Sequence, residues 1–158
     1  MRFNIKTICV AQVLILGVAA LVLSVSKGVM PVSASNAQNG QLHVTKDCAG
    51  YQGYAGQSCT IKSSNLDEIK VGSTVFYDQN AGIPAGLLDS NVVLDAGNGN
   101  RAVGRCTLDL ATGLGLCTFS DGFGAFAGFE ARVNVSFRPS TNDFLWQGTY
   151  SFDPPRNR

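Results

Sequence analysis

Three alternating runs between residues 101 and 137 constrain the fold of this chain more than any other feature. Arg101–Asp109 and Leu114–Ser120 flank a short turn at 110–113, and Phe129–Phe137 follows a glycine-rich segment. In the last run, apolar residues occupy every second position and mostly polar residues lie between them. A period of two places the two sets on opposite faces of a strand. The stretch therefore predicts three neighbouring strands joined by tight connections.

The rest of the chain carries similar signals. Five further strands are expected, at Gln41–Thr45, Ser58–Ser64, Ser73–Tyr77, Leu88–Asp95 and Phe144–Phe152. Asn98 and Gly99 predict a hairpin between the fourth and fifth strands, because both positions accept a positive φ. Eight short strands with frequent turns and no long helical period are typical of an all-β sandwich or barrel. Hairpin connections favour an eight-stranded antiparallel up-and-down β-barrel, whose closure removes exposed strand edges.

The first 34 residues have the composition of a secretory signal peptide. A basic start at Arg2 and Lys6 precedes the apolar run Ile8–Val25, and Val32-Ser33-Ala34 fits a small-residue cleavage site. Cleavage after residue 37 is the alternative site. An uncleaved anchor is the alternative fate, because the apolar run approaches the ~20 residues that span a bilayer.

Cleavage defines the expected organisation of the mature protein. It would consist of a β-barrel domain at 41–153 and a short tail at 154–158, exported to the extracellular space or the periplasm without stable membrane insertion. Removing Arg2, Lys6 and Lys27 leaves nine of the 12 basic residues against 11 acidic ones. No basic cluster remains to neutralise phosphates, so nucleic acid is not an expected partner.

Four cysteines remain after the signal peptide, which contains Cys9. An even number in an exported domain predicts disulfides, with three connectivities open. Cys106 and Cys117 would face each other across the turn at 110–113 if they pair. Cys48 and Cys59 would then close a short loop. We expect these two disulfides.

A zinc site is the rival interpretation of the cysteines. Their spacings of about ten residues exceed the two to four that are usual for zinc ligands, and His43 is the chain's one histidine. We expect His43 to be an ordinary strand residue, and we expect no metal and no cofactor.

Two segments resemble the allene oxide cyclase and dirigent family of calycin-like barrels. Gly122–Ala131 is similar to the family's glycine-rich turn before a late strand, with Phe123 where Thr or Ser is usual. Gly72–Asp78 looks like its early strand, and the resemblance covers Val71–Phe152. It implies an eight-stranded barrel with a mostly apolar cavity, in a protein that forms dimers or trimers.

The family's chemistry transfers poorly onto this chain. Plant allene oxide cyclases isomerise an unsaturated fatty-acid epoxide, and dirigent proteins guide phenoxy-radical coupling or quinone-methide cyclisation. The cyclase's first strand carries a Glu and an Asn, whereas Gln41–Thr45 contains no acid, and Thr74 stands where its early-strand Asn would fall. We therefore expect an exported barrel that binds a hydrophobic small molecule or a partner without catalysis. An isomerase, cyclase or dirigent-like guide is one alternative, and a self-associating interaction protein is the other.

Candidate site residues follow from the predicted strand faces. Eight side chains near those faces could do acid–base work. The catalytic candidates are Tyr77, Asp78, Glu130 and Arg132, and the other four are Asp89, Asp95, Arg105 and Tyr150. The side chains expected to line a cavity and bind a ligand are Phe76, Phe126, Trp146 and Tyr150. Glu130 and Arg132 share one face of a strand, which we expect to be the solvated exterior. Phe126, within a glycine turn at 121–128, is expected to point inward and plug one end of the barrel.

Overall fold

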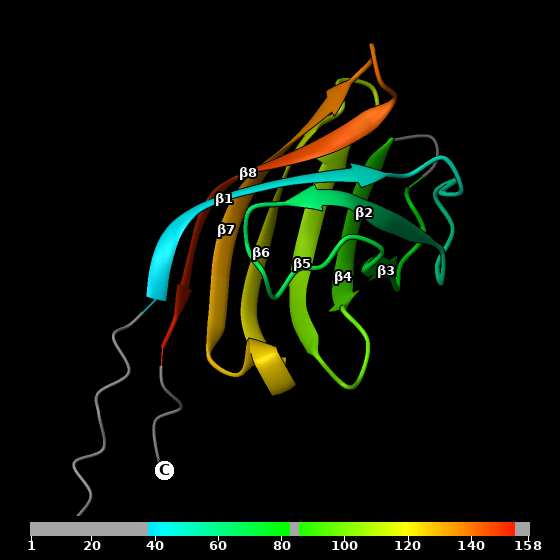
Figure 1. The fold of residues 1–158 in the computed structure, drawn as a ribbon. Helices are drawn as coiled ribbons and strands as arrows, with labels where there is room; N and C mark the ends of the chain where they lie inside the picture. The colour runs from blue at the N-terminus through cyan, green and yellow to red at the C-terminus, as the bar shows by residue number, and fades with distance from the viewer. Residues whose placement is uncertain (1–37, 83–85, 154–158) are drawn as a thin grey trace, which may run out of the picture. The chain divides into compact units, whose positions relative to one another are not determined.

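The structure, a computed structural model, describes residues 38–82 and 86–153, which form eight strands and one short 3₁₀ helix (Figure 1). In chain order these are β1 (Gln38–Asp47), β2 (Ser58–Ser64), β3 (Thr74–Tyr77), β4 (Leu87–Asp95), β5 (Arg101–Asp109), β6 (Leu114–Phe123), η1 (Gly124–Phe126), β7 (Phe129–Arg138) and β8 (Asp143–Phe152). The expected signal peptide, with both cleavage sites, and the expected tail lie outside the described residues.

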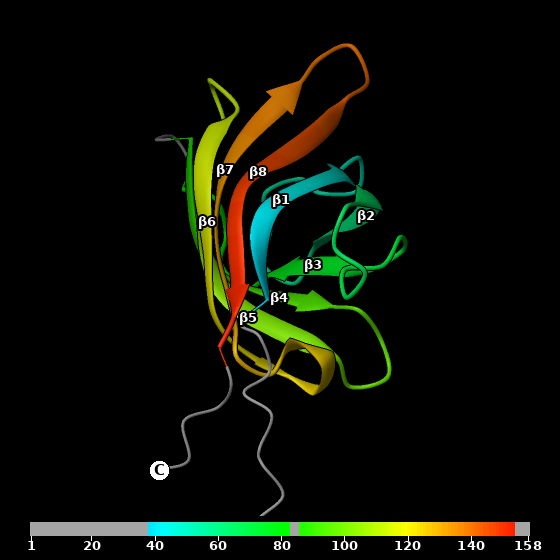
Figure 2. The same cartoon turned by 60° about the vertical axis from the view of Figure 1, so that its left-hand side comes forward.

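The strands form one closed barrel in which each pairs with its neighbours in sequence and β8 pairs with β1 (Figure 2). Every pairing is antiparallel, and the β1–β8 ladder runs without a shift from Gln38 opposite Phe152 to Asp47 opposite Asp143. The prediction of an all-β, eight-stranded up-and-down barrel is therefore confirmed. Within residues 38–82 and 86–153, no helix has the length and apolar character needed to cross a bilayer.

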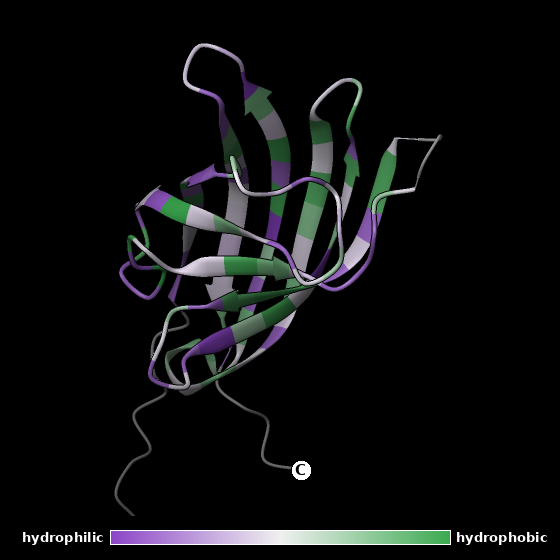
Figure 3. Ribbon diagram, turned by 90° about the vertical axis from the view of Figure 1, so that its right-hand side faces the viewer, coloured by the Kyte–Doolittle hydropathy of each residue, from purple (hydrophilic) through white to green (hydrophobic). Residues whose placement is uncertain are grey.

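Hydrophobic and hydrophilic residues alternate along several strands (Figure 3), and the burial of the side chains follows this alternation. In β7 the apolar residues at alternate positions are buried and the polar residues between them are exposed: Phe129, Ala131, Val133 and Val135 are buried, whereas Glu130, Arg132 and Asn134 are exposed. The interior is filled largely by apolar side chains, of which Trp146 is the largest that is fully buried. The barrel core thus follows the period-two pattern of the sequence.

The sequence predicted a turn over residues 121–128, but in the structure β6 continues to Phe123 and the turn begins only at Gly124. Residues 121–123 extend β6 instead and continue its ladder with β5, where Arg101 lies opposite Phe123 and Ala102 opposite Gly122. A register shift between Val103 and Gly104 accommodates this continuation. Such a β-bulge inserts one extra residue into one strand of the pair, and the pairing of β5 with β6 resumes beyond it. The turn proper is η1 and its flanks.

One end of the barrel is closed by η1. Gly124, the first residue of η1, and Gly128, which follows it, have φ values of 64° and 75°, a region that favours glycine. Phe126 is fully buried, as expected, and its ring packs edge-on against Phe129 with centroids 5.3 Å apart. We call this the η1 end; it also holds the β4–β5 connection (Figure 1).

Both expected disulfides are present. Cys48 and Cys59 are bonded with a Cα–Cα distance of 4.3 Å, and Cys106 and Cys117 with one of 4.1 Å. The second pair bridges directly opposite positions on β5 and β6. Three of these cysteines, Cys59, Cys106 and Cys117, are buried in the core. Two disulfides are consistent with folding in an oxidising compartment outside the cytosol.

Removing the Phe126 ring should destabilise the barrel sharply. Phe126→Ala would leave a cavity beneath η1, and a loss of about 3–5 kcal/mol in unfolding free energy is expected for such a truncation. Glu130→Gln changes an exposed side chain on the adjacent strand and should alter stability by less than about 0.5 kcal/mol. Urea unfolding followed by tryptophan fluorescence measures both. Equal midpoints for the two variants would show that Phe126 does not close the core.

Gly128 and Gly97 form a matched pair for testing the η1 turn. Both have a positive φ, of 75° and 80°, but a Cβ at Gly128 would collide with the Asp153 backbone whereas one at Gly97 meets open space. Gly97→Ala should therefore cost only the local strain of about 1 kcal/mol. Gly128→Ala should cost considerably more, measured as a larger fall in melting temperature. Similar falls for both would contradict the tight packing of the β7 start against the β8 end.

Candidate functional site

The end of the barrel opposite η1 contains a buried lysine and several aromatic side chains. The up-and-down order places the β1–β2, β3–β4, β5–β6 and β7–β8 connections at this end (Figures 1 and 2). The last residues of β1 and β3 and the first residues of β8 therefore meet here. We call it the Lys46 end, after the side chain that distinguishes it.

Lys46 is buried inside the barrel. It follows Leu42 and Val44 on the inward face of β1, and 3% of it is exposed. Its Nζ is hydrogen-bonded to the Tyr77 hydroxyl on β3. The same nitrogen lies 4.7 Å from the Trp146 ring centroid, 5.1 Å from that of Tyr77 and 5.8 Å from that of Phe144. A lysine amine is thus enclosed by aromatic rings from β3 and β8, a geometry that attracts a cation.

The buried amine lacks an acidic partner. All 11 acidic residues lie within the described parts of the chain, whose ion pairs join Lys62 to Asp143, Arg101 to Asp95 and Arg105 to Asp89. Burial without a counter-charge disfavours the protonated form. It lowers the pKa of Lys46 from 10.5 to about 7. Near neutral pH the amine therefore exists in both protonation states.

Lys46 and the aromatic side chains around it, Tyr77, Phe144 and Trp146, together with Tyr51, are called the Lys46 cluster. A loop from Cys48 to Gln57 covers this cluster and contributes Tyr51 to it. Tyr51 in this loop packs on the Tyr77 ring with centroids 4.8 Å apart, and the Gly56 N–H donates to the Tyr77 carbonyl at 2.7 Å. The Cys48–Cys59 disulfide ties the loop to β2, and the Cys59 sulfur lies 3.9 Å from the Tyr77 hydroxyl. The loop is thus held in position by the Gly56–Tyr77 hydrogen bond and by the Cys48–Cys59 disulfide.

The polar atoms of this cluster are mainly hydrogen-bond donors. The Tyr51 hydroxyl and the Trp146 Nε1 are buried and have no partner among the described residues. Burial raises the pKa of Tyr77, with a further contribution from Tyr51, so both phenols keep their protons. Indole N–H and ammonium groups can only donate. A group that accepts hydrogen bonds, such as a carboxylate or carbonyl oxygen, would complement the cluster.

Inward-facing apolar side chains near the cluster are partly exposed. By alternation, Leu108, Phe137 and Phe144 belong to the interior faces of β5, β7 and β8, yet each is accessible to solvent, Phe137 by 37%. The rings of Phe137 and Phe144 pack 5.0 Å apart. At the η1 end, in contrast, Phe126 and Phe129 are fully buried. The Lys46 end therefore presents partly exposed apolar side chains beside the buried amine.

Two predicted site residues, Tyr77 and Trp146, belong to the Lys46 cluster. The structure places Phe76 instead on the outer face of β3, 41% exposed, so it does not line the interior. Asp78 is exposed after β3, where its carboxylate accepts hydrogen bonds from Asn91 and Ser90. Those bonds, chiefly that from Asn91, lower the pKa of Asp78. Neither Phe76 nor Asp78 contributes to the cluster.

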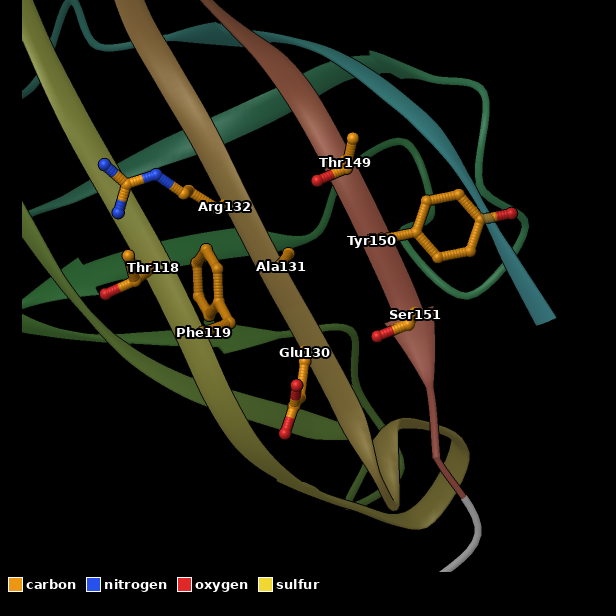
Figure 4. A pocket seen from close by; sticks show the side chains of 8 residues that line it. All are labelled: Thr118, Phe119, Glu130, Ala131, Arg132, Thr149, Tyr150 and Ser151. Atoms are coloured by element: carbon orange, nitrogen blue, oxygen red, sulfur yellow. The ribbon is translucent and has the colours of Figure 1, made fainter. Parts of the chain in front are cut away.

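The remaining predicted site residues lie elsewhere. Phe126 plugs the η1 end, and Tyr150 leans across β1 over Gly40 (Figure 4). Glu130 and Arg132 lie on the exterior of β7, as expected, beside a shallow depression of about 410 Å³. Their side chains point away from each other (Figure 4). The predicted residues therefore do not form one site.

Lys46 is the central residue that sequence reasoning missed. The expected first strand ended at Thr45, whereas β1 continues to Asp47. Extending the alternation of Leu42 and Val44 by one step would have placed Lys46 on the inward face. Lysine is seldom fully buried, so the residue type alone favoured a surface position for Lys46.

Comparison of the chain with protein-family models, with curated proteins and with solved structures gives no match in any of the three. The site's chemistry must therefore be judged from its own geometry.

Replacing Lys46 by methionine should stabilise the protein in a pH-dependent way. The depressed pKa corresponds to a penalty on the order of 4–5 kcal/mol at pH 6, where the buried amine must be protonated. This penalty lessens as pH rises above 7 toward 10.5, because the folded lysine loses its proton before the unfolded one. The advantage of Lys46→Met should thus shrink by roughly 2–3 kcal/mol between pH 6 and pH 9.

Urea unfolding at the two pH values measures this difference. Lys70→Met, which alters an exposed lysine, is the control and should leave stability nearly unchanged. An advantage of Lys46→Met that does not vary with pH would mean that the amine stays charged throughout.

Proposed function

We propose that this protein is an exported β-barrel that binds a hydrophobic small molecule, with Lys46 receiving the ligand's acidic or carbonyl head group. The buried amine without a carboxylate partner is the observation that carries this proposal. A ligand carboxylate would supply the missing counter-charge. Unpaired buried charges are strongly unfavourable, so a partner that neutralises one gains affinity.

The surroundings of Lys46 support a ligand with an apolar body. Phe137 and Phe144 extend from the Lys46 cluster to the solvent-accessible rim. Binding sites for small molecules are mostly apolar with a few polar groups that fix orientation. A chain or ring system packed on these aromatic side chains would direct its head group toward the amine.

The acidic residues favour binding over the cyclase alternative. An acid–base cyclase needs a buried carboxylate with a raised pKa. Asp143 is the buried acid among the described residues, but the ion pair with Lys62 lowers its pKa. The other acids with a resolved shift, Asp78, Asp89 and Asp95, also have lowered pKa values. These acids are therefore suited to remain ionised.

Membership of the allene oxide cyclase and dirigent family and export from the cytosol are part of this proposal. A closed eight-stranded barrel is the architecture that the resemblance to allene oxide cyclases and dirigent proteins implies, and the two disulfides suit an exported protein. Cleavage of the signal peptide and assembly into dimers or trimers stay predictions.

Fluorescence titration with cis-parinaric acid and its methyl ester tests the proposal. The acid should bind the wild-type protein, and Lys46→Met should weaken its affinity by about tenfold or more. The ester, which has no charge, should be affected much less. The acid's affinity should also fall as pH rises from 6 to 8, because Lys46 loses its proton over that range.

Lys62→Met is the matched control, since Lys62 is half exposed and pairs with Asp143 on the outside of the barrel. It should leave the affinity for both probes unchanged. Equal binding of acid and ester, with no effect of Lys46→Met on either, would refute a head-group site at Lys46.

A further inference from the structure

The three lysines of the described residues occupy contrasting environments. Lys62 has 48% of its side chain exposed and donates to Asp143 at 2.8 Å, an interaction that raises its pKa. Lys70 is exposed in the β2–β3 connection. Lys46 is buried among aromatic rings, with the Tyr77 hydroxyl as its hydrogen-bond partner. Of these three amines, Lys46 is thus the one that is enclosed by apolar groups and has no acidic partner within the described parts of the chain.

Nucleophilic chemistry at an amine requires the unprotonated form. A lysine enclosed in apolar surroundings loses its proton near neutral pH and becomes a nucleophile toward carbonyl groups. Lys46 meets this condition through burial and through the absence of a carboxylate partner among the described residues. The aromatic rings around it also exclude water, which would otherwise hydrolyse the product.

We infer that Lys46 captures hydrophobic aldehydes covalently, as an imine at the Lys46 end of the barrel. This inference rests on the proposed function, because the aldehyde enters by the same apolar rim and places its carbonyl oxygen among the same donors. It adds a reaction to that binding site and names a substrate class.

The reaction balances without any further reagent. The Nζ lone pair forms a bond to the aldehyde carbon as the carbon–oxygen π bond breaks, and one proton passes from Nζ to the carbonyl oxygen to give a carbinolamine. Loss of the hydroxyl group with a proton as water then leaves a carbon–nitrogen double bond. One aldehyde and one amine thus yield one imine and one water, with no change in oxidation state.

The Tyr77 hydroxyl is positioned to assist. It contacts Nζ directly, and its pKa is raised by burial, so it remains a neutral hydrogen-bond donor. A donor beside the reacting nitrogen can stabilise the oxygen of the carbinolamine and the departing water. The unpartnered Tyr51 hydroxyl adds a second donor in the loop above.

Reductive trapping tests the inference on the intact, disulfide-bonded protein. The protein is incubated at pH 7.5 with decanal and sodium cyanoborohydride, which converts an imine into a stable secondary amine. Peptide mapping by mass spectrometry then locates the alkylated lysine. We expect Lys46 to be modified about tenfold faster than Lys62 or Lys70, which serve as controls within the same molecule. Modification of Lys62 and Lys70 at the rate of Lys46 or faster would overturn the inference.

A conservative variant separates this inference from the proposed function. Lys46→Arg keeps a positive charge but cannot form an imine, so it should retain affinity for cis-parinaric acid and lose the trapping at position 46. Wild-type protein that binds the acid but is not trapped at Lys46 would refute the imine and leave the binding proposal intact. Wild-type protein that does neither would refute both. Should Lys46→Arg not fold, the comparison among the three wild-type lysines still decides the matter.

Discussion

The pairing of β1 with β8 is the constraint on which the rest of the structure depends. It closes the barrel over the full length of both strands, from Gln38 opposite Phe152 to Asp47 opposite Asp143. Because side chains alternate with a period of two, a slip of one residue would exchange the faces. Leu42 and Val44 would then face solvent. The burial of these apolar side chains fixes the register, and the register places Lys46 inside the barrel.

An inward lysine on such a strand works against stability. The apolar residues that hold β1 in register compensate for it, as do the aromatic rings around the amine. Local features that lower stability commonly occur at sites of binding or reaction. The remaining buried side chains of the barrel are mostly apolar or, as with Asp143, paired with an opposite charge. Lys46 is thus the one charged side chain within the described interior whose position packing alone does not explain.

Most of the fold could be predicted from the sequence, because the alternation that reveals a strand also determines its buried face. β2 and β5 begin and end where expected. The Cys106–Cys117 disulfide follows from directly opposite places on neighbouring strands, and the remaining pair, Cys48 and Cys59, closes a short loop. Phe76 was misplaced because Val75, Phe76 and Tyr77 are all apolar or aromatic, so their pattern does not distinguish inside from outside. Pairing with β4 decides the matter, since Phe76 lies opposite the outward-facing Val93. The site was harder to predict, because its members come from β1, β3, β8 and a loop far apart in sequence.

The two ends of the barrel differ in ways that make the Lys46 end the place for the proposed ligand site. At the η1 end, Phe126 and Phe129 fill the interior, and Gly128 brings the chain against the backbone of Asp153. At the Lys46 end lies a loop held by the Cys48–Cys59 disulfide, and the buried Tyr51 hydroxyl and Trp146 Nε1 have no hydrogen-bond partner among the described residues. The proposed ligand would therefore reach the amine from the Lys46 end, where Phe137 is exposed to solvent.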